Sequence, residues 1–207
     1  LDHLKEIDFS NVDMSEVKNA VSLFEKCTNL KRVSLNAKVP AQPTNLTQAF
    51  SCCYTLESVT LGNFDTSQVE YFTSFFYDCY NLQSFEFNKV DISSAKYMGN
   101  MFQECYRLRV ADLSSWKSDS VMDISSMFSL CSSLTKVILP EQGIHIGKVD
   151  SAYGSSATFY KCTSLTSIEN LNRLDTSQVE YMDGMFYGCK NLTALDLSSF
   201  DTSNVKK

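Results

Sequence analysis

Histidine is nearly absent from this sequence. Only His3 and His145 occur among the 207 residues, and they lie far apart in different repeats, where neither has the partners of a nucleophile–base pair. Without a C-x-x-C pair as well, we expect no zinc site. No glycine-rich phosphate loop or nucleophile motif accompanies them. We therefore expect a protein that is not an enzyme, with no metal and no cofactor. Recurring Asp and Glu leave glycoside hydrolysis as an alternative, although an exposed polar sheet lacks the enclosing cleft that this chemistry uses.

An excess of positive charge and long apolar runs are missing as well. Lys and Arg number 18 against 24 Asp and Glu, which gives a net charge of -6, and no basic cluster occurs. Because phosphate backbones and anionic lipids are bound by clustered cations, the charge balance disfavours nucleic acid and anionic membranes as partners. No segment approaches the roughly 18 consecutive apolar residues of a membrane-spanning helix, so we expect no direct membrane insertion.

A repeated motif dominates what is present. The pattern Phe-x-x-Cys-x-x-Leu recurs, with successive Phe residues 26 apart four times, then 31 and 27 apart. The Phe and Cys pairs are Phe24 and Cys27, Phe50 and Cys53, Phe76 and Cys79, Phe102 and Cys105, Phe128 and Cys131, Phe159 and Cys162, and Phe186 and Cys189. Leu4 opens the matching leucine series, 26 residues before Leu30. These eight units indicate a solenoid of stacked repeats.

Each unit combines two kinds of apolar spacing. Apolar residues follow the repeat leucine at +3 and +5, as Phe85 and Phe87 follow Leu82, which predicts a short half-buried strand. Between strands the spacing changes to three and four, as from Val69 to Phe72, which predicts a one-sided helical turn. We expect the side-chain oxygens of an Asp-Thr-Ser sequence to cap the first amides of that turn. This sequence occurs at residues 65–67, 175–177 and 201–203.

The repeat predicts one architecture for the whole chain. We expect residues 1–207 to form a single α/β repeat solenoid, a right-handed superhelix. A parallel sheet of about eight short strands would lie on one side, with short helices or helical turns on the other. Since the repeats start almost at residue 1 and continue to the last residue, we expect either further repeats in a longer parent protein or end-to-end self-association.

Two segments carry a family resemblance. Met182-Asp-Gly-Met-Phe-Tyr-Gly-Cys189 and Leu192-Thr-Ala-Leu-Asp-Leu-Ser-Ser-Phe-Asp-Thr-Ser-Asn-Val205 resemble the repeat of BspA-like leucine-rich-repeat bacterial surface proteins, also found in mycoplasma lipoprotein arrays. The resemblance covers nearly the full chain and implies an extracellular, cell-surface module that binds a host or matrix protein or glycan. An intracellular protein-interaction scaffold and a structural spacer stalk remain the alternatives.

Cysteine is frequent, with eight residues, seven of them at the repeat position. Equivalent cysteines in neighbouring repeats have parallel Cβ directions, which is poor geometry for a disulfide. We therefore expect buried free thiols that act as small core hydrophobes. Cys52 lies outside this column, and we expect it to be exposed and reactive.

Tyrosine gives the clearest sign of a binding surface. Tyr54, Tyr80 and Tyr106 follow the repeat cysteine in three consecutive repeats, whereas the other repeats carry Thr28, Ser132, Thr163 and Lys190 there. The core therefore does not require tyrosine at this position. An exposed aromatic strip would suit stacking on a sugar or anchoring a protein ligand. The alternative is that the rings only pad the solenoid edge by stacking on one another.

Two further regions are candidates for ligand binding. Glu86 and Asp112 belong to a column predicted to point outward from the sheet, which would give it an acidic face for a basic partner or simply a solvated one. His145 and Tyr153 lie in the irregular insertion between residues 140 and 158, and loops on regular scaffolds often carry recognition.

Overall fold

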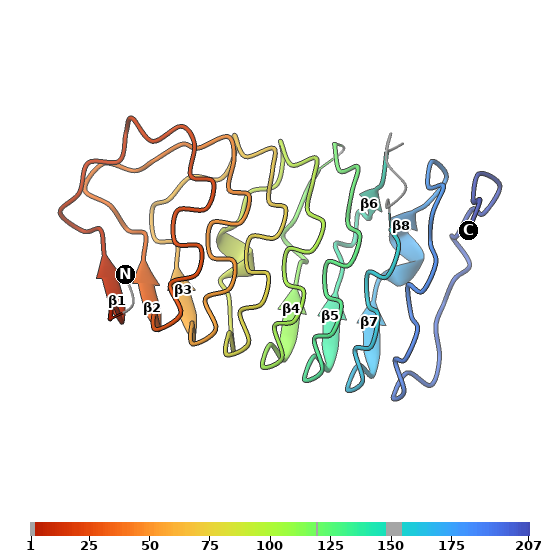
Figure 1. Cartoon of the computed structure of the whole chain (residues 1–207). Coiled ribbons are helices and arrows are strands. Elements are labelled where there is room, and N and C mark those ends of the chain that lie inside the picture. Colours follow the sequence, from red (N-terminus) through yellow and green to blue (C-terminus); the bar gives the residue numbers. More distant parts are fainter. Residues whose placement is uncertain (1–2, 119, 148–154) are drawn as a thin grey trace.

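The protein is a solenoid of stacked coils. A computed structural model describes residues 3–118, 120–147 and 155–207. Successive coils lie side by side from the N-terminal to the C-terminal end (Figure 1). Neighbouring strands pair in parallel one repeat apart, as Ile7 with Val33 and Val33 with Val59. The predicted repeat solenoid with parallel strands is therefore confirmed.

The strands are short and form three sheets. They are β1 (Glu6–Asp8), β2 (Arg32–Ser34), β3 (Ser58–Thr60), β4 (Val110–Asp112), β5 (Lys136–Ile138), β6 (Ile144–His145), β7 (Ser167–Glu169) and β8 (Leu174–Asp175). The strand orders are β1-β2-β3, β4-β5-β7 and β6-β8. Strands β1 to β5 and β7 lie in one row, whereas β6 and β8 pair at a separate place in the coils (Figure 1). The sequence predicts a single parallel sheet, whereas the structure has three.

The segment between β3 and β4 carries bulky aromatic residues and forms no strand. Where the repeat predicts a strand at residues 85–87, the structure has the 3-10 helix η1 (Phe87–Lys89). Phe85 and Phe87 are both buried, and Phe87 packs against Trp116 with 6.1 Å between ring centroids. The Trp116 indole Nε1 donates a hydrogen bond of 3.0 Å to the Phe87 carbonyl. The Leu61 amide bonds the Glu86 side chain here. The equivalent Leu35 amide bonds a backbone carbonyl, that of Thr60, so the backbone ladder is interrupted at this coil.

The side opposite the strands consists of tight turns and almost no helix. Apart from η1, the described residues contain one more short 3-10 helix, η2 (Leu171–Arg173). Each coil instead has two residues with left-handed backbone, four positions apart, such as Ser74 (φ 56°) and Asp78 (φ 60°). A left-handed residue stops helix propagation. The three-and-four spacing of apolar residues therefore comes from consecutive tight turns, and the final coil meets the same demand with Gly184 and Gly188.

The backbone amides of these turns form hydrogen bonds both within the turn and to the next coil. The Phe75 amide donates to the Phe72 carbonyl within its own turn, whereas the Phe76 amide donates to the Met101 carbonyl of the next coil. Alternation of this kind gives every coil a second hydrogen-bonded edge. Parallel bridges between Asn45, Tyr71 and Tyr97 continue that edge.

The Asp-Thr-Ser sequence also stabilises turns. Asp65 Oδ1 accepts a 2.9 Å hydrogen bond from the Ser67 amide, so the aspartate satisfies the first free amide as predicted, although a turn follows it and not a helix. The buried Thr66 hydroxyl donates to the Asp91 carbonyl and accepts from the Asp91 amide. The motif therefore links each turn to the next coil.

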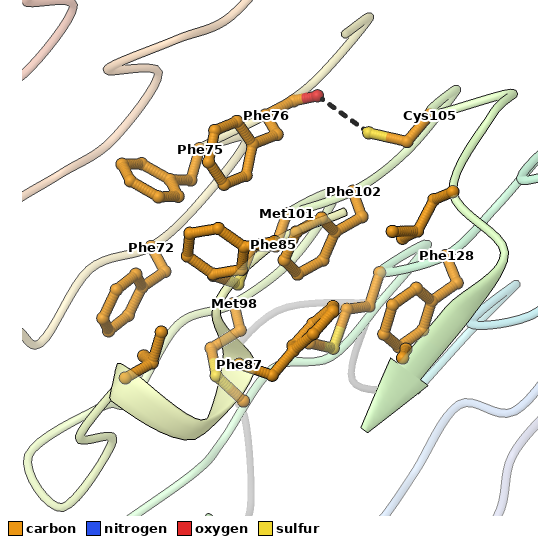
Figure 2. Close-up of a cluster of buried hydrophobic side chains, with 14 of the residues drawn as sticks. Phe72, Phe75, Phe76, Phe85, Phe87, Met98, Met101, Phe102, Cys105 and Phe128 are labelled. Atoms are coloured by element: carbon orange, nitrogen blue, oxygen red, sulfur yellow. Dashed lines mark hydrogen bonds between the residues drawn. The ribbon is translucent and has the colours of Figure 1, made fainter. Parts of the chain in front are cut away.

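The core is a column of stacked aromatic rings lined with thiols. Phe102 lies between Phe76 and Phe128, with centroid separations of 5.6 and 5.5 Å (Figure 2). The Cys105 thiol donates a 3.3 Å hydrogen bond to the Phe76 carbonyl of the preceding coil, the dashed line in Figure 2. The corresponding bond is made by Cys53, Cys79, Cys131, Cys162 and Cys189.

The prediction of free thiols is confirmed, since all eight cysteines are free. Six of them are buried, while Cys189 and Cys52 are partly exposed. Burial raises the pKa of the Cys53 thiol to about 12, which keeps it protonated and available as a hydrogen-bond donor. The repeat cysteine is thus a core residue that also bonds one coil to the next.

Candidate functional site

Three tyrosines form a continuous stack along one edge of the solenoid. We call Tyr54, Tyr80 and Tyr106 the tyrosine strip. Each follows a repeat cysteine whose thiol is bonded to the preceding coil, so the repeat itself fixes the spacing of the rings. Tyr80 lies 5.0 Å from both Tyr54 and Tyr106, with interplanar angles of 16° and 21°. The expectation that these residues align is therefore correct.

The stacking decides which parts of the rings face solvent. Both faces of Tyr80 are covered by its neighbours, and one face each of Tyr54 and Tyr106 is covered. Tyr54 retains 37% of its surface, and the other two rings are partly exposed. The strip therefore offers ring edges and hydroxyl groups to a ligand, with few free faces. Because sugars stack on ring faces, this arrangement fits protein contacts better than a row of sugar-binding platforms.

Two carboxylates lie beside the strip, and they were not identified from the sequence. Asp78 and Glu104 each precede a strip tyrosine by two residues and occupy equivalent left-handed positions in adjacent coils. The Tyr106 hydroxyl donates a 2.5 Å hydrogen bond to Glu104. Asp78 Oδ1 is buried and has no hydrogen-bond partner among the described residues. The only signal in the sequence is that acidic residues replace Lys26, Cys52, Leu130, Lys161 and Gly188 of the other repeats.

The electrostatics of this cluster are unbalanced. Burial, together with repulsion from Glu104, raises the pKa of Asp78 to about 6. Burial and the same two carboxylates raise the pKa of Tyr80 to about 12. The hydrogen bond from the Tyr106 hydroxyl to Glu104 raises the pKa of Tyr106. Among the described residues, no Lys or Arg forms an ion pair with either carboxylate. A cation placed here would relieve the repulsion.

The sheet-face candidates have structural partners. Glu86 accepts a 2.8 Å hydrogen bond from the Leu61 amide, and Asp112 accepts one of 3.0 Å from the Ser114 amide. The hydrogen bonds from Ser114 lower the pKa of Asp112. Nearby acidic residues are also balanced by cations, for example Glu169 by Lys136 at 2.6 Å. Both carboxylates therefore stabilise the turns and edges of the sheet.

Of the two candidates in the insertion, the structure describes His145. Tyr153 lies outside the described residues. His145 lies on β6, and its Nδ1 is 2.7 Å from Asp175 Oδ2 on β8. Both residues line a hollow of about 550 Å³, together with Lys117, Gln142 and Arg173. The strip and this hollow lie on separate elements of the coils, so the sequence candidates do not converge on one site.

Two further observations concern the part of the chain that the structure describes. There, no group of three or more His, Cys, Asp and Glu side chains is placed to hold a metal ion. In the same residues, no helix is long and apolar enough to cross a membrane.

Comparison with known proteins gives a family match, and the fold is supported by a leucine-rich repeat structure. A family model described as "Mycoplasma protein of unknown function, DUF285" matches residues 44–153 and 153–207. A leucine-rich repeat protein of T. pallidum is similar in structure, with a TM-score of 0.52 and 22% sequence identity over 91% of this chain and 71% of that one. A leucine-rich repeat protein from Bacteroides ovatus aligns with a TM-score of 0.31 and 19% identity, over 93% of this chain and 66% of that one. None of the curated proteins matches.

Proposed function

This chain belongs to the family described as "Mycoplasma protein of unknown function, DUF285", a BspA-like leucine-rich-repeat family, and we propose that it is a non-enzymatic adhesion module of a cell-surface protein. Its repeat family supports a protein-interaction role. The contact surface in this proposal is the tyrosine strip with Asp78 and Glu104. The ligand is a protein that presents a basic segment. The single observation that carries the proposal is the stacked strip beside two carboxylates that form no ion pair with a Lys or Arg among the described residues.

The scaffold does not explain these residues. Other coils are built with Thr28, Ser132 or Thr163 in place of the tyrosines, and with Lys26 or Lys161 in place of the acids. Their coincidence in coils next to one another concentrates partly exposed aromatic surface and negative charge in one place. Tyrosine is enriched at the energetic centres of protein interfaces because it buries much area at little entropic cost.

Charge and ring geometry together favour a basic protein segment. Guanidinium and ammonium groups pair with carboxylates and also pack against aromatic rings. A ligand cation near Asp78 would offset the repulsion from Glu104 and lower the carboxyl pKa from about 6, so binding would release a proton at mildly acidic pH. The affinity is therefore expected to fall as pH drops below about 6.

The test measures, by surface plasmon resonance, how tightly the purified protein binds immobilised peptides and matrix proteins. The peptides are an arginine-containing sequence and the same sequence with glutamate in place of arginine. We expect the basic peptide to bind. The triple variant Tyr54→Ser, Tyr80→Ser, Tyr106→Ser should weaken that binding at least about tenfold, as loss of interface tyrosines commonly does.

A matched control is built into the chain. Tyr71 and Tyr97 form a second stacked pair, 5.2 Å apart, beside an ion pair between Lys96 and Glu70. Tyr71→Ser with Tyr97→Ser removes stacked rings without touching the two acids, and it should leave binding unchanged. Equal binding of both peptides, or equal loss in both variants, contradicts the proposed site. Absence of binding to any peptide or matrix protein would favour the spacer function.

A further inference from the structure

Two arginines on this protein of net negative charge have no side-chain partner among the described residues. Arg107 and Arg109 are two of only four arginines in the chain. Both are exposed, and within the described residues neither forms an ion pair or a side-chain hydrogen bond. Arg32, by contrast, is paired with Glu6 and Glu57.

Neighbouring coils show that the scaffold does not need arginine here. At the position of Arg107, Thr55 and Asn81 use their side chains to bond carbonyls of the preceding coil, at 2.9 and 2.8 Å. At the position of Arg109, the next coil has Thr135, whose hydroxyl donates to the Arg109 carbonyl at 3.0 Å. The two arginines replace residues that link coils, and they make no such link themselves among the described residues.

The arginines line a hollow at the break in the sheet. Its volume is about 600 Å³, and its lining residues are Gln83, Ser84, Arg107, Arg109 and Ser133. In the coils on either side, equivalent positions are joined by backbone bonds, as when the Glu57 amide donates to the Lys31 carbonyl at 2.8 Å. Within the described part of the chain, no such bond joins the Arg109 amide to the Gln83 carbonyl. The polar hollow therefore lies where the backbone ladder after β3 is interrupted.

We propose that this hollow binds a carbohydrate that carries a single acidic group, a carboxylate or a sulfate. The planar guanidinium groups of Arg107 and Arg109 match an oxyanion, with two parallel N–H donors each. The hydroxyls of Ser84 and Ser133 and the amide of Gln83 suit the hydroxyl groups of a sugar ring. The volume lies within the usual range for small-ligand sites.

Two observations select this ligand class over other anions. All five lining residues are polar, so the hollow has no apolar side chain to anchor an acidic peptide. The net charge of -6 repels long polyanions, which disfavours nucleic acid but hardly affects a ligand with one charge. The site is separate from the tyrosine strip, and its failure would leave the proposed protein contact intact.

The experiment follows the side-chain Nε–H resonances of the four arginines by NMR during titration. The probes are glucuronate, its neutral methyl ester, glucose 6-sulfate, and sodium acetate and sodium sulfate as free oxyanions. An aspartyl-glycine dipeptide is added as the peptide arm. We expect glucuronate or glucose 6-sulfate to shift Arg107 and Arg109 with a saturable curve, while Arg32 and Arg173 stay fixed. The sugar acid that binds more tightly identifies the oxyanion, and the methyl ester should not bind.

Two variants test the assignment. Arg107→Ser with Arg109→Thr gives this coil the residues of the next one, Ser133 and Thr135, so the fold should persist. It should weaken sugar-acid binding, measured by calorimetry, at least about tenfold, as expected when charge-assisted hydrogen bonds are lost. Lys18→Ser with Lys38→Ser removes the same charge from exposed positions elsewhere and should leave the affinity unchanged.

Several outcomes would overturn the proposal. Equal affinity for free acetate or sulfate and for the sugar acids would show that the carbohydrate contributes nothing. Tighter binding of the dipeptide would assign the hollow to acidic peptides. Comparable shifts of all four arginines, or equal losses in both variants, would reduce the effect to general charge attraction.

Discussion

Replacing Asp78 by asparagine should stabilise the protein at neutral pH while weakening its binding to a basic ligand. Asp78 has a buried oxygen without a hydrogen-bond partner among the described residues, and Glu104 repels its charge. Asparagine keeps the shape and tolerates the left-handed backbone at this position (φ 60°). The substitution therefore removes the charge with little change in structure.

The magnitude follows from the pKa. A rise from 3.8 in the unfolded chain to about 6 in the fold corresponds to about 3 kcal/mol. Since the side chain is partly exposed, solvent screening reduces this to about 1–2 kcal/mol. The folded state holds the proton more tightly than the unfolded state. The resulting stability is fully present below about pH 4 and is lost as pH rises through about 6.

Urea unfolding at pH 4, 5, 6 and 7 measures this directly. The Asp78→Asn variant should match the wild type near pH 4 and exceed its free energy of unfolding by about 1–2 kcal/mol at pH 7. As a control, Glu104→Gln removes the repulsion alone and should flatten the wild-type pH dependence only in part. An Asp78→Asn curve parallel to the wild type from pH 4 to 7 would refute the reasoning.

Three further predictions concern the scaffold. Cys52 should be the first thiol modified by iodoacetamide in the native protein, since six of the other cysteines are buried and burial raises the pKa of Cys189. Peptide mass spectrometry identifies the modified site, and early labelling of Cys105 would contradict the core structure. Gly143→Ala should destabilise the insertion by about 2 kcal/mol or more, because Gly143 has a φ of +84° and a Cβ there would lie 2.1 Å from the Arg173 carbonyl oxygen. An unchanged melting temperature in calorimetry would count against that geometry. Phe102→Ala should cost about 3–5 kcal/mol in urea unfolding, because it removes a fully buried ring from the middle of the stack; a loss below about 1 kcal/mol would mean that the coils collapse around the gap.

The candidate site was only half visible in the sequence. Tyr54, Tyr80 and Tyr106 were identified because their column departs from the repeat, and the structure aligns them at 5.0 Å. Asp78 and Glu104 were overlooked, since a single acidic residue within a repeat has no distinctive pattern. Whether the tyrosine strip binds a ligand stays a prediction.

The sheet-face residues illustrate a different limit. Alternation predicts that Glu86 and Asp112 point away from the core, but it does not say which amides they reach. In the fold, Glu86 bonds Leu61 of the preceding coil, a contact between residues 25 positions apart. The turn and edge contacts of these acids therefore became known only from the tertiary structure, and their role in ligand binding stays a prediction.

The sequence by itself determined the period, the parallel stacking and the identity of the core. Those properties follow from one pattern, since apolar residues at a fixed interval bury a common edge only when the coils stack in register. The tertiary structure decided how the backbone turns between strands and where the sheet breaks. Turns with left-handed residues and helices share the same three-and-four apolar spacing, so periodicity alone does not separate them. At the break, the Leu61 amide bonds the Glu86 side chain of the next coil and Phe87 contacts Trp116 of the coil after it. Such contacts between residues far apart in the sequence are fixed only in the folded chain.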